Sequence, residues 1–392
     1  MERSVDTSRG GQRRPLRSRD GRHMRIGLVS ADFYPNVGGV AAHVVELGRA
    51  LAIAGPDVHV ISLPIAEQRQ QKTPLHGMTV HRPAIPQVKP LFTWWMHGYL
   101  RSLLRTTPLD LLHVHGMRPL EATRNLGVPV IFTNHTSGFL KRVEKGPAEH
   151  RRALKRLEHV EHVLAPSGEL VEATQTVGYR GPVTFIPNGV DVERFVPGKP
   201  AKDFPWSKTN GEVVILLARR LVEKNGVRVF AEAIARLKGR PIRVVFAGDG
   251  PERPAVTRIL SDADMLERCI FLGNVPNPEM PDIYRSADVS VLPSFMEATS
   301  ITGLESMACG LPLVGTRVGG IPTLIDQGKT GWLVPPGNAV ALAEAIDQPV
   351  KNADLRQAAG QAARQRAVEN FSWAEIAART ADVYRQRMQK AA

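Results

Sequence analysis

Short apolar runs alternate with helical stripes in both halves of this 392-residue chain, and this alternation constrains the fold more than any other feature. Each apolar run has the length of a buried strand, and stripes such as 41–52 have the spacing of an amphipathic helix. The expected strands are 25–30, 57–62, 111–115, 130–133, 213–217, 243–247, 269–272 and 289–293. Strands that alternate with helices form doubly wound parallel sheets. The sequence therefore predicts an α/β protein with two Rossmann-like domains.

A polar, proline-rich stretch between residues 197 and 211 separates the two halves and is typical of a linker. The expected organisation is a disordered basic tail (1–23), an N-terminal domain (24–200), a linker (201–211), a C-terminal domain (212–370) and a C-terminal helix (371–392) that could pack back on the N-terminal domain. Ligands of such sheets bind beyond the carboxyl ends of the strands. We therefore expect the site in a cleft between the two domains.

The formal charge of +13 indicates either an anionic partner or charge that is merely solvated. Residues 1–23 carry seven arginines against three acidic residues, a composition typical of a disordered tail. A second basic cluster consists of Lys141, Arg142, Lys145, Arg151, Arg152, Lys155 and Arg156. A solvated helix face is the favoured interpretation of this cluster, and attraction to an anionic membrane or a phosphorylated acceptor is the alternative. Nucleic acid is not an expected partner, because aromatic residues are not interleaved with these charges.

The sequence predicts no membrane-spanning helix, because no stretch approaches 18 consecutive apolar residues. No apolar region follows the basic start, so a secretory signal is not expected and the cytoplasm is the expected compartment, with peripheral contact at the inner face of the membrane as a further option. Trp94 and Trp95 are predicted to lie on a buried helix face, with an acceptor or membrane contact as the alternative. Cys269 and Cys309, the only cysteines, are expected to be inert core thiols.

Residues 294–312 hold two carboxylates, Glu297 and Glu305, where a buried strand is expected to lead through a loop into a helix. Ser300 and Thr302 lie at the expected start of that helix, where unpaired amides and the helix dipole favour a phosphate. Carboxylates accept hydrogen bonds from sugar and ribose hydroxyls. One loop could thus hold a nucleotide-sugar along its length.

This segment resembles the E-x7-E signature of the retaining glycosyltransferases of family four, which have the GT-B fold. The resemblance covers nearly all of residues 24–390. Its other elements are Gly38-Gly39 and the segments 133–135, 187–191, 219–224, 247–251 and 328–331. The chain departs from the family where Ala298-Thr299-Ser300 replaces the Pro-Phe-Gly of many members, which leaves the donor sugar open.

The resemblance implies a retaining, metal-independent hexosyltransferase that moves a sugar from a UDP- or GDP-linked donor to a hydroxyl acceptor. Such enzymes act in glycolipid, cell-envelope polysaccharide or small-glycoside biosynthesis. It also implies that the N-terminal domain binds the acceptor and the C-terminal domain the nucleotide-sugar. Neither a cofactor nor a metal ion is expected, because the sequence is interpreted as lacking an Asp-x-Asp metal motif.

The resemblance also assigns site residues. The implied catalytic residues are His135, Arg219, Lys224 and Glu297, and the implied donor-binding residues are Gly38, Gly39, Gly250, Val275, Ser300, Ile301, Thr302 and Glu305. Arg219 and Lys224 follow an expected strand, so they could neutralise a departing diphosphate. Glu297 should reach the transferred sugar and Glu305 the ribose.

Three alternatives remain open. A sugar-nucleotide 2-epimerase shares the fold, although the pairing of Arg219 and Lys224 with the E-x7-E loop favours a transferase. A nicotinamide-dependent oxidoreductase would need a G-x-G-x-x-G turn, which residues 30–35 do not provide. A noncatalytic sugar-binding protein would release no nucleotide from a donor.

Overall fold

The computed structural model describes six stretches of the chain. These are residues 21–35, 39–64, 72–88, 90–135, 137–200 and 211–390. Gly38, most of the expected basic tail and residues 201–210 of the expected linker lie outside the described residues.

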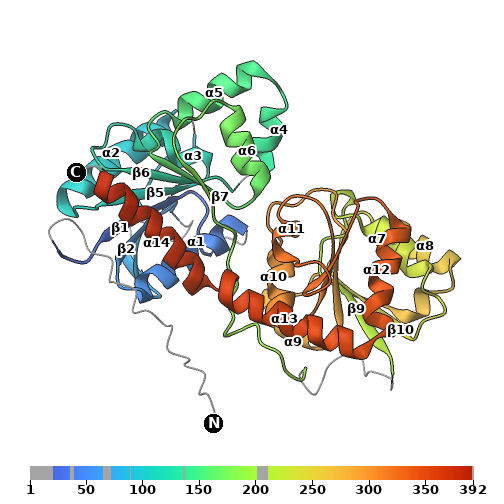
Figure 1. Ribbon diagram of the computed structural model, residues 1–392. Coiled ribbons are helices and arrows are strands. Elements are labelled where there is room, and N and C mark those ends of the chain that lie inside the picture. The colour runs from blue at the N-terminus through green and yellow to red at the C-terminus, as the bar shows by residue number, and fades with distance from the viewer. Residues whose placement is uncertain are drawn as a thin grey trace, which may run out of the picture. The chain divides into compact units, whose positions relative to one another are not determined.

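The first sheet has eight strands in the order β3-β4-β2-β1-β5-β6-β7-β8 (Figure 1). Its strands are β1 (Arg25–Ser30), β2 (Asp57–Ile61), β3 (Lys72–Leu75), β4 (Met78–His81), β5 (Leu111–His115), β6 (Val130–Thr133), β7 (His162–Ala165) and β8 (Val183–Phe185). β1 pairs in parallel with both β2 and β5, and only the β3–β4 hairpin pairs antiparallel among the registered pairs of this sheet. After β1, the next strands β2, β3 and β4 are added on one side of β1, and β5 is then added on its other side. The direction of winding therefore reverses between β1 and β5.

Helices connect these strands. They are α1 (Gly39–Ile53), α2 (Leu91–Thr106), α3 (Met117–Leu120), the 3-10 turn η1 (Glu121–Thr123), α4 (Ser137–Val143), α5 (Pro147–Leu157) and α6 (Gly168–Thr176). α1 buries residues three and four apart, such as Val44, Leu47 and Leu51, as an amphipathic helix does.

The outer face of α2 corrects one sequence-based prediction. The helix forms before β5 as expected and buries Phe92, Met96 and Leu100. Trp94 and Trp95, however, are 71% and 48% exposed, so the prediction that they lie on a buried face is wrong. The reason is their register, since positions 94 and 95 face away from the stripe formed by positions 92, 96 and 100.

The second sheet has six strands in the order β11-β10-β9-β12-β13-β14, and all its registered pairs are parallel (Figure 1). The strands are β9 (Val213–Leu217), β10 (Ile242–Ala247), β11 (Cys269–Gly273), β12 (Val289–Leu292), β13 (Leu313–Thr316) and β14 (Gly331–Val334). Winding proceeds from β9 to β11 and then reverses at β12, which lies on the other side of β9. The topological switch point of this sheet is therefore between β9 and β12.

The second sheet is flanked by further helices. They are the 3-10 turns η2 (Glu223–Asn225), η3 (Leu266–Arg268) and η4 (Asn277–Glu279) and the helices α7 (Val227–Ala235), α8 (Arg253–Asp262), α9 (Met280–Arg285), α10 (Ile301–Ala308), α11 (Ile321–Leu324), α12 (Ala339–Lys351) and α13 (Ala353–Phe371). The last helix, α14 (Trp373–Lys390), follows α13 in the chain.

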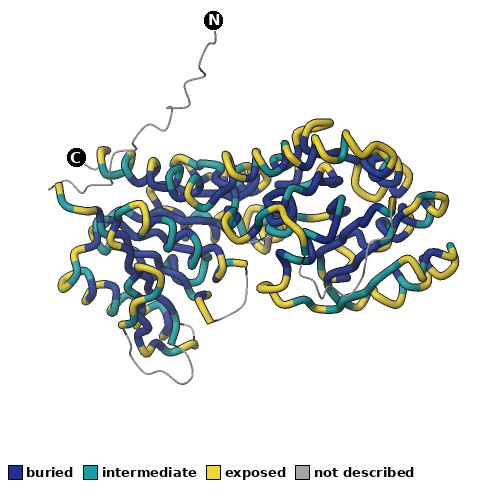
Figure 2. Tube along the Cα trace, turned by 90° about the horizontal axis from the view of Figure 1, so that it is seen from below, coloured by how far each residue is buried: buried dark blue, intermediate teal, exposed yellow. Residues whose placement is uncertain are grey.

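Both faces of the second sheet are buried. Ile215 and Leu217 of β9 pack with Phe230 of α7, whereas the intervening Leu216 packs with Leu304 of α10 on the other face. Alternate residues of a strand point to opposite faces, so an almost continuously apolar strand requires helices on both sides. Figure 2 shows the strands as buried segments and the outer turns of the helices as exposed. The predicted α/β architecture with two parallel sheets is confirmed.

The chain divides into two compact units. The first comprises residues 1–132, 159–162 and 377–392, and the second comprises 133–158 and 163–376. In the first unit, the hydroxyl of Tyr384 on α14 lies 2.7 Å from Nδ1 of His113 on β5, and both side chains are fully buried. The end of the chain is thus part of the core that surrounds β5. Across the described parts of the chain, no helix combines the length and apolarity needed to cross a membrane.

Candidate active site

Two loops meet at the switch point of the second sheet, one after β9 and one after β12. The backbone N–H of Phe295 donates to the carbonyl of Lys224 at 2.9 Å, which joins the two loops directly. Ligands of open α/β sheets bind beyond the carboxyl ends of the strands at such a point. The site residues predicted on these two loops therefore lie where a ligand of this sheet is expected to bind.

Arg219 and Glu297 form an ion pair across these loops. Arg219, two residues beyond β9, donates from Nη2 to Oε2 of Glu297 and from Nη1 to the hydroxyl of Ser294. Only 11% of the Arg219 side chain and 14% of the Glu297 side chain are exposed. The sequence assigned the two residues separate roles, and the pairing was not predicted. The two contacts, to Glu297 and to Ser294, together fix the orientation of the Arg219 guanidinium.

Lys224, unlike Arg219, is not neutralised by an ion pair with a described carboxylate. It is exposed within η2, and no carboxylate forms an ion pair with it among the residues that the structure describes. The neighbouring Gly226 has φ 67°, and a Cβ there would lie 1.8 Å from the carbonyl oxygen of Pro293. A glycine is therefore required for the loop of Lys224 to approach the strand end of β12 so closely. Sequence reasoning did not identify Gly226.

The predicted strand–loop–helix geometry is present after β12. α10 begins at Ile301, and the hydroxyl of Ser300 accepts a hydrogen bond from the N–H of Gly303 at 3.2 Å. This is an N-cap, which satisfies one of the unpaired amides of the first turn. Ser300 and Thr302 also lie 3.2 Å apart through their hydroxyl oxygens. The positive end of the α10 dipole is thus at the loop that carries Glu297.

Glu305 lies on α10, and its side chain is buried, with only 5% of the residue exposed. The hydroxyl of Tyr284 donates to its Oε2 at 2.8 Å, and Nδ2 of Asn277 lies 3.5 Å from its Oε1. Burial raises the pKa of Glu305 to about 7, while the bond from Tyr284 opposes that rise. The Tyr284 contact was not predicted, since nothing in the sequence links positions 21 residues apart on different helices.

Two glycines of the loop after β10 have a structural reason to be glycines. A Cβ at Gly250 would lie 2.3 Å from the carbonyl oxygen of Leu221, and one at Gly248 would lie 2.0 Å from that of Arg219. The missing side chains let this loop pack directly on the backbone that carries Arg219. Val275, in the loop after β11, is half-buried against the core beneath α10.

The backbone of the E-x7-E loop is held by two glycines that sequence reasoning missed. Gly319 has φ 53°, and a Cβ there would lie 1.5 Å from the carbonyl oxygen of Glu297. At Gly320 a Cβ would lie 2.0 Å from the carbonyl oxygen of Ala298. The sequence feature that could have identified them is the pair Gly319-Gly320 soon after β13, which resembles the pair Gly38-Gly39 after β1.

In the first sheet, Gly39 opens α1 and is exposed, and a Cβ there would meet nothing within 4 Å. Among the described residues, none fills the space beside Gly39. His135 lies two residues beyond β6 and is partly buried.

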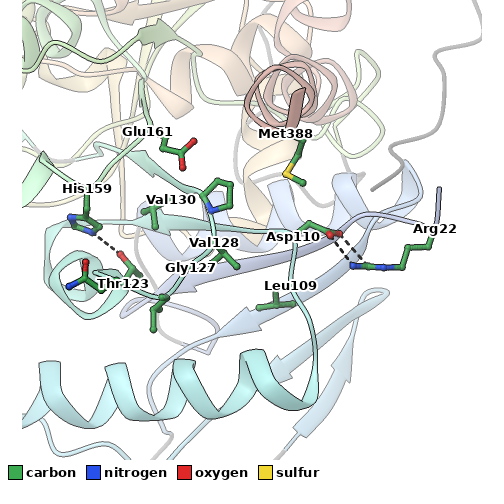
Figure 3. A pocket seen from close by; sticks show the side chains of 13 residues that line it. Arg22, Leu109, Asp110, Thr123, Gly127, Val128, Val130, His159, Glu161 and Met388 are labelled. Carbon is green, nitrogen blue, oxygen red and sulfur yellow. Dashed lines mark hydrogen bonds and ion pairs between the residues drawn. The ribbon is translucent and has the colours of Figure 1, made fainter. Parts of the chain in front are cut away.

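A cavity of about 600 Å³ lies elsewhere in the first unit and contains none of the predicted site residues (Figure 3). It is lined by residues that precede β5, β6 and β7, such as Asp110, Pro129 and Glu161. It therefore opens at the amino ends of the strands, the edge at which such sheets do not bind their ligands. Asp110 is already paired with Arg22 at 2.8 Å.

The sequence does contain one Asp-x-Asp, Asp262-Ala263-Asp264, so the interpretation that the chain lacks this motif is wrong. It lies at the carboxyl end of α8, which returns the chain to the amino end of β11, so it is at the edge opposite Arg219. Asp264 is bound by Nζ of Lys238 at 2.7 Å. This motif is separate from the loops of the candidate site.

The basic cluster of residues 141–156 lies on α4, on α5 and, through Lys145, in the turn between them. Acidic residues are interspersed among its charges, and Glu149 pairs with Arg152. The exposed positions of Arg151 and Arg152 agree with a solvated helix face.

Comparison with known proteins identifies the chain. The model described as glycosyltransferase family 4 matches residues 37–194, and the model described as glycosyl transferases group 1 matches residues 198–366. D-inositol 3-phosphate glycosyltransferase of Pseudarthrobacter chlorophenolicus is 30% identical over 402 residues, covering 92% of this chain and 94% of that protein. The chain belongs to glycosyltransferase family 4. The predicted family membership and enzyme class are therefore confirmed, and the protein is a glycosyltransferase.

Other relatives of this glycosyltransferase have diverse names. N-acetyl-alpha-D-glucosaminyl L-malate synthase of Bacillus anthracis is 25% identical, covering 92% of this chain and 96% of that protein. Among solved structures, sucrose-phosphate synthase from Thermosynechococcus elongatus superposes with a TM-score of 0.75 at 22% identity, over 94% of this chain and 100% of that one. HepE of Anabaena in complex with UDP-glucose superposes with a TM-score of 0.71 at 17% identity, over 93% of this chain and 100% of that one. The two structures show that the fold is shared.

Proposed function

We propose that this glycosyltransferase moves a hexosyl group from a nucleoside-diphosphate sugar to a hydroxyl acceptor, with retention of anomeric configuration and without a metal ion. The observation that carries the proposal is the juxtaposition of Lys224 with the Arg219–Glu297 pair at the switch point of the second sheet.

The charges at this point suit a departing diphosphate. Breaking the bond between the anomeric carbon and the diphosphate places negative charge on a phosphate oxygen. Lys224 is exposed and unpaired among the described residues, so it can approach that oxygen, and the α10 amino end adds a favourable dipole. Arg219 is held by Glu297 and Ser294, so it offers its remaining N–H groups in a fixed direction.

The proposed reaction needs no further reactant. The acceptor hydroxyl oxygen forms a bond to the anomeric carbon on the face from which the diphosphate leaves, and its proton passes to the departing phosphate oxygen. No cofactor is required, because the nucleotide-sugar is itself the second substrate. We assign His135 and Glu297 to the transferred sugar, and Gly38, Gly39, Gly250, Val275, Ser300, Ile301, Thr302 and Glu305 to the donor's other groups.

A UDP-linked sugar is the proposed donor. HepE, whose fold is shared, has been solved with UDP-glucose, which supports a uridine nucleotide here. The pairing of Glu305 with Tyr284 leaves its Oε1 with the long contact to Asn277 alone among its described hydrogen bonds, so this oxygen is the proposed acceptor of a ribose hydroxyl.

The test combines binding and turnover. Thermal shift and calorimetry with UDP and GDP should show stabilisation by UDP, and incubation with UDP-sugars and hydroxyl acceptors should release UDP and give an α-glycoside from an α-linked donor. Glu297→Gln should lower transfer about a hundredfold or more while leaving UDP affinity unchanged, because only the sugar-bearing donor reaches it. Glu267→Gln, an exposed position at η3, is the matched control.

Three results would contradict the proposal. A product of inverted configuration would overturn the retaining mechanism. Loss of bare UDP binding in Glu297→Gln would overturn the placement of the donor along the loop. Absence of both UDP binding and donor-dependent UDP release across the donor panel would favour a noncatalytic protein.

A further inference from the structure

Helix α2 presents an exposed stripe that contains none of the residues assigned to the candidate site. Leu91, Trp94, Trp95, Gly98, Arg101 and Arg105 occupy positions that share one face of the helix, and all six are exposed. Leu91 is 50% exposed, Trp94 71% and Trp95 48%, and the preceding Val88 is 68% exposed. A cluster of large apolar side chains on the surface marks an interaction site.

The opposite face of α2 is firmly attached to the first unit. Phe92, Met96 and Leu100 are fully buried. Nδ1 of His97 lies 3.1 Å from the carbonyl oxygen of Ala122, and the hydroxyl of Tyr99 lies 3.1 Å from Nδ1 of His81. The exposed stripe is therefore presented by a fixed helix and not by a segment that can turn its tryptophans inward.

A hollow of about 470 Å³ runs beside the stripe. Its lining is mainly apolar and comprises Pro83, Ala84, Ile85, Trp94, Trp95, His97, Gly98, Tyr99 and Arg101. Gly98 has no side chain, and a Cβ there would point into unoccupied space beside the hollow. The absence of a side chain at this position therefore widens the mouth of the hollow. The two indole rings meet edge to face with centroids 5.8 Å apart.

The chain segment that carries the stripe has basic residues and no acidic ones. Residues 68–109 contain no Asp or Glu and six Lys or Arg. Arg101 and Arg105 lie on the exposed stripe itself, one and two turns beyond Gly98. This differs from α4 and α5, where acidic residues are interspersed with the basic ones.

We propose that this face of α2, with Val88, Leu91, Trp94 and Trp95 as its apolar part and Arg101 and Arg105 as its basic part, docks on the surface of a bilayer that contains anionic lipids. Tryptophan rings favour the level of the lipid headgroups, where one part of the ring is apolar and the other wet. Basic side chains beside them attract anionic headgroups. The apolar hollow accepts part of a lipid chain, and a fixed amphipathic face of this kind lies in the interface and does not cross it.

Vesicle binding by the full chain tests the proposal. Vesicles of phosphatidylcholine alone and vesicles with about a third phosphatidylglycerol are compared by co-sedimentation, at low and high salt. The protein should bind the anionic vesicles, and high salt should weaken the binding. Each basic residue near an anionic surface raises the affinity about fivefold, so Arg101→Gln with Arg105→Gln should lower it about 25-fold.

The apolar part is tested by Trp94→Ala with Trp95→Ala, which should lower the affinity at least tenfold at both salt concentrations. Circular dichroism and UDP release without vesicles should be unchanged, because both side chains are exposed. The matched control is Arg236→Gln with Arg258→Gln, two exposed arginines at the second sheet, which should bind as the unmodified protein does.

Three outcomes would overturn the proposal. The first is failure of the unmodified protein to bind anionic vesicles more tightly than neutral ones. The second is unchanged binding in both α2 variants. The third is a loss confined to Lys141→Gln with Lys145→Gln, which would assign the contact to α4 and its neighbours instead.

Discussion

The guanidinium of Arg219 and the carboxylate of Glu297 are paired at the switch point of the second sheet, with 11% and 14% of their side chains exposed. A pair so sheltered from water depends on both partners, because removal of one leaves a poorly solvated charge. It therefore couples the proposed catalytic role of each residue to the stability of the loops that carry them.

Arg219→Ala should lower both turnover and stability. We expect turnover to fall by a factor of about 10² to 10⁴ and the free energy of unfolding to fall by about 1–3 kcal/mol. A double-mutant cycle with Glu297→Ala, followed by urea unfolding, measures the coupling. Additive losses in the cycle would show that the ion pair does not contribute to stability.

Lys224→Ala should separate activity from stability. Its side chain is exposed and has no ion pair within the described chain, so the free energy of unfolding should change by less than about 0.5 kcal/mol. Turnover should nevertheless fall by a factor of about 10² to 10⁴ if Lys224 meets the leaving diphosphate. Lys329→Ala, in the turn before β14, is the control. Full turnover in Lys224→Ala would remove this residue from the mechanism.

Glu305 should give the protein a measurable dependence of stability on pH. Burial raises the pKa of its carboxyl from 4.5 to about 7 in the folded protein. Between these values the folded protein holds a proton that the unfolded chain has lost, so the free energy of unfolding falls as pH rises through this window.

Glu305→Gln should abolish this component. The difference in the free energy of unfolding between variant and unmodified protein should change by on the order of 1–3 kcal/mol between pH 4.5 and pH 8 in favour of the variant. Urea unfolding at four pH values measures it, with Asp262→Asn at an exposed position as control. A constant difference across the range would mean that Glu305 ionises normally.

Tyr384→Phe should destabilise the first unit. The change removes the hydroxyl that lies 2.7 Å from Nδ1 of His113 in a fully buried setting. The expected cost is about 1–3 kcal/mol in the free energy of unfolding, because a buried hydrogen bond is removed. Thermal and urea unfolding measure the cost, and Tyr34→Phe at an exposed tyrosine is the control. Equal stability of the two variants would contradict the prediction.

Chelation should leave sugar transfer nearly unchanged. Lys224 and Arg219 supply positive charge at the strand ends, and the Asp-x-Asp at 262–264 lies at the opposite edge of the sheet. Initial rates with EDTA and with added Mg²⁺ or Mn²⁺ provide the measurement. A rate that collapses with EDTA and returns with the metal would assign diphosphate neutralisation to a cation.

The parallel sheets were predictable because their strands are short, apolar and regularly spaced. β1, β5, β6 and β9 begin and end at the predicted residues. The β3–β4 hairpin was missed, because Lys72–Leu75 at the sheet edge is polar and contains a proline. The strands β7, β8, β13 and β14 were not predicted either, although β7 and β13 lie in the interior of their sheets.

The site was predictable at the level of loops and not at the level of contacts. The motif located Glu297 and the start of α10 from sequence, since strand, loop and helix each have a local signal. The hydrogen bond from Tyr284 to Glu305 and the steric demand at Gly319 depend on segments that approach only after folding. The exposure of Trp94 could not be predicted, because the sequence doublet Trp94-Trp95 does not show which of these positions faces the core.

The burial of Tyr384 against His113 has a consequence for how the protein is made. Residues 377–392 belong to the same unit as residues 1–132, although the second unit lies between them in the chain. Domains generally fold as units while the ribosome releases the chain from its N-terminus. Here a segment that completes the first unit follows the second unit in the chain, so the ribosome makes it after residues 163–376. The core around His113 can therefore close only after translation has passed Tyr384.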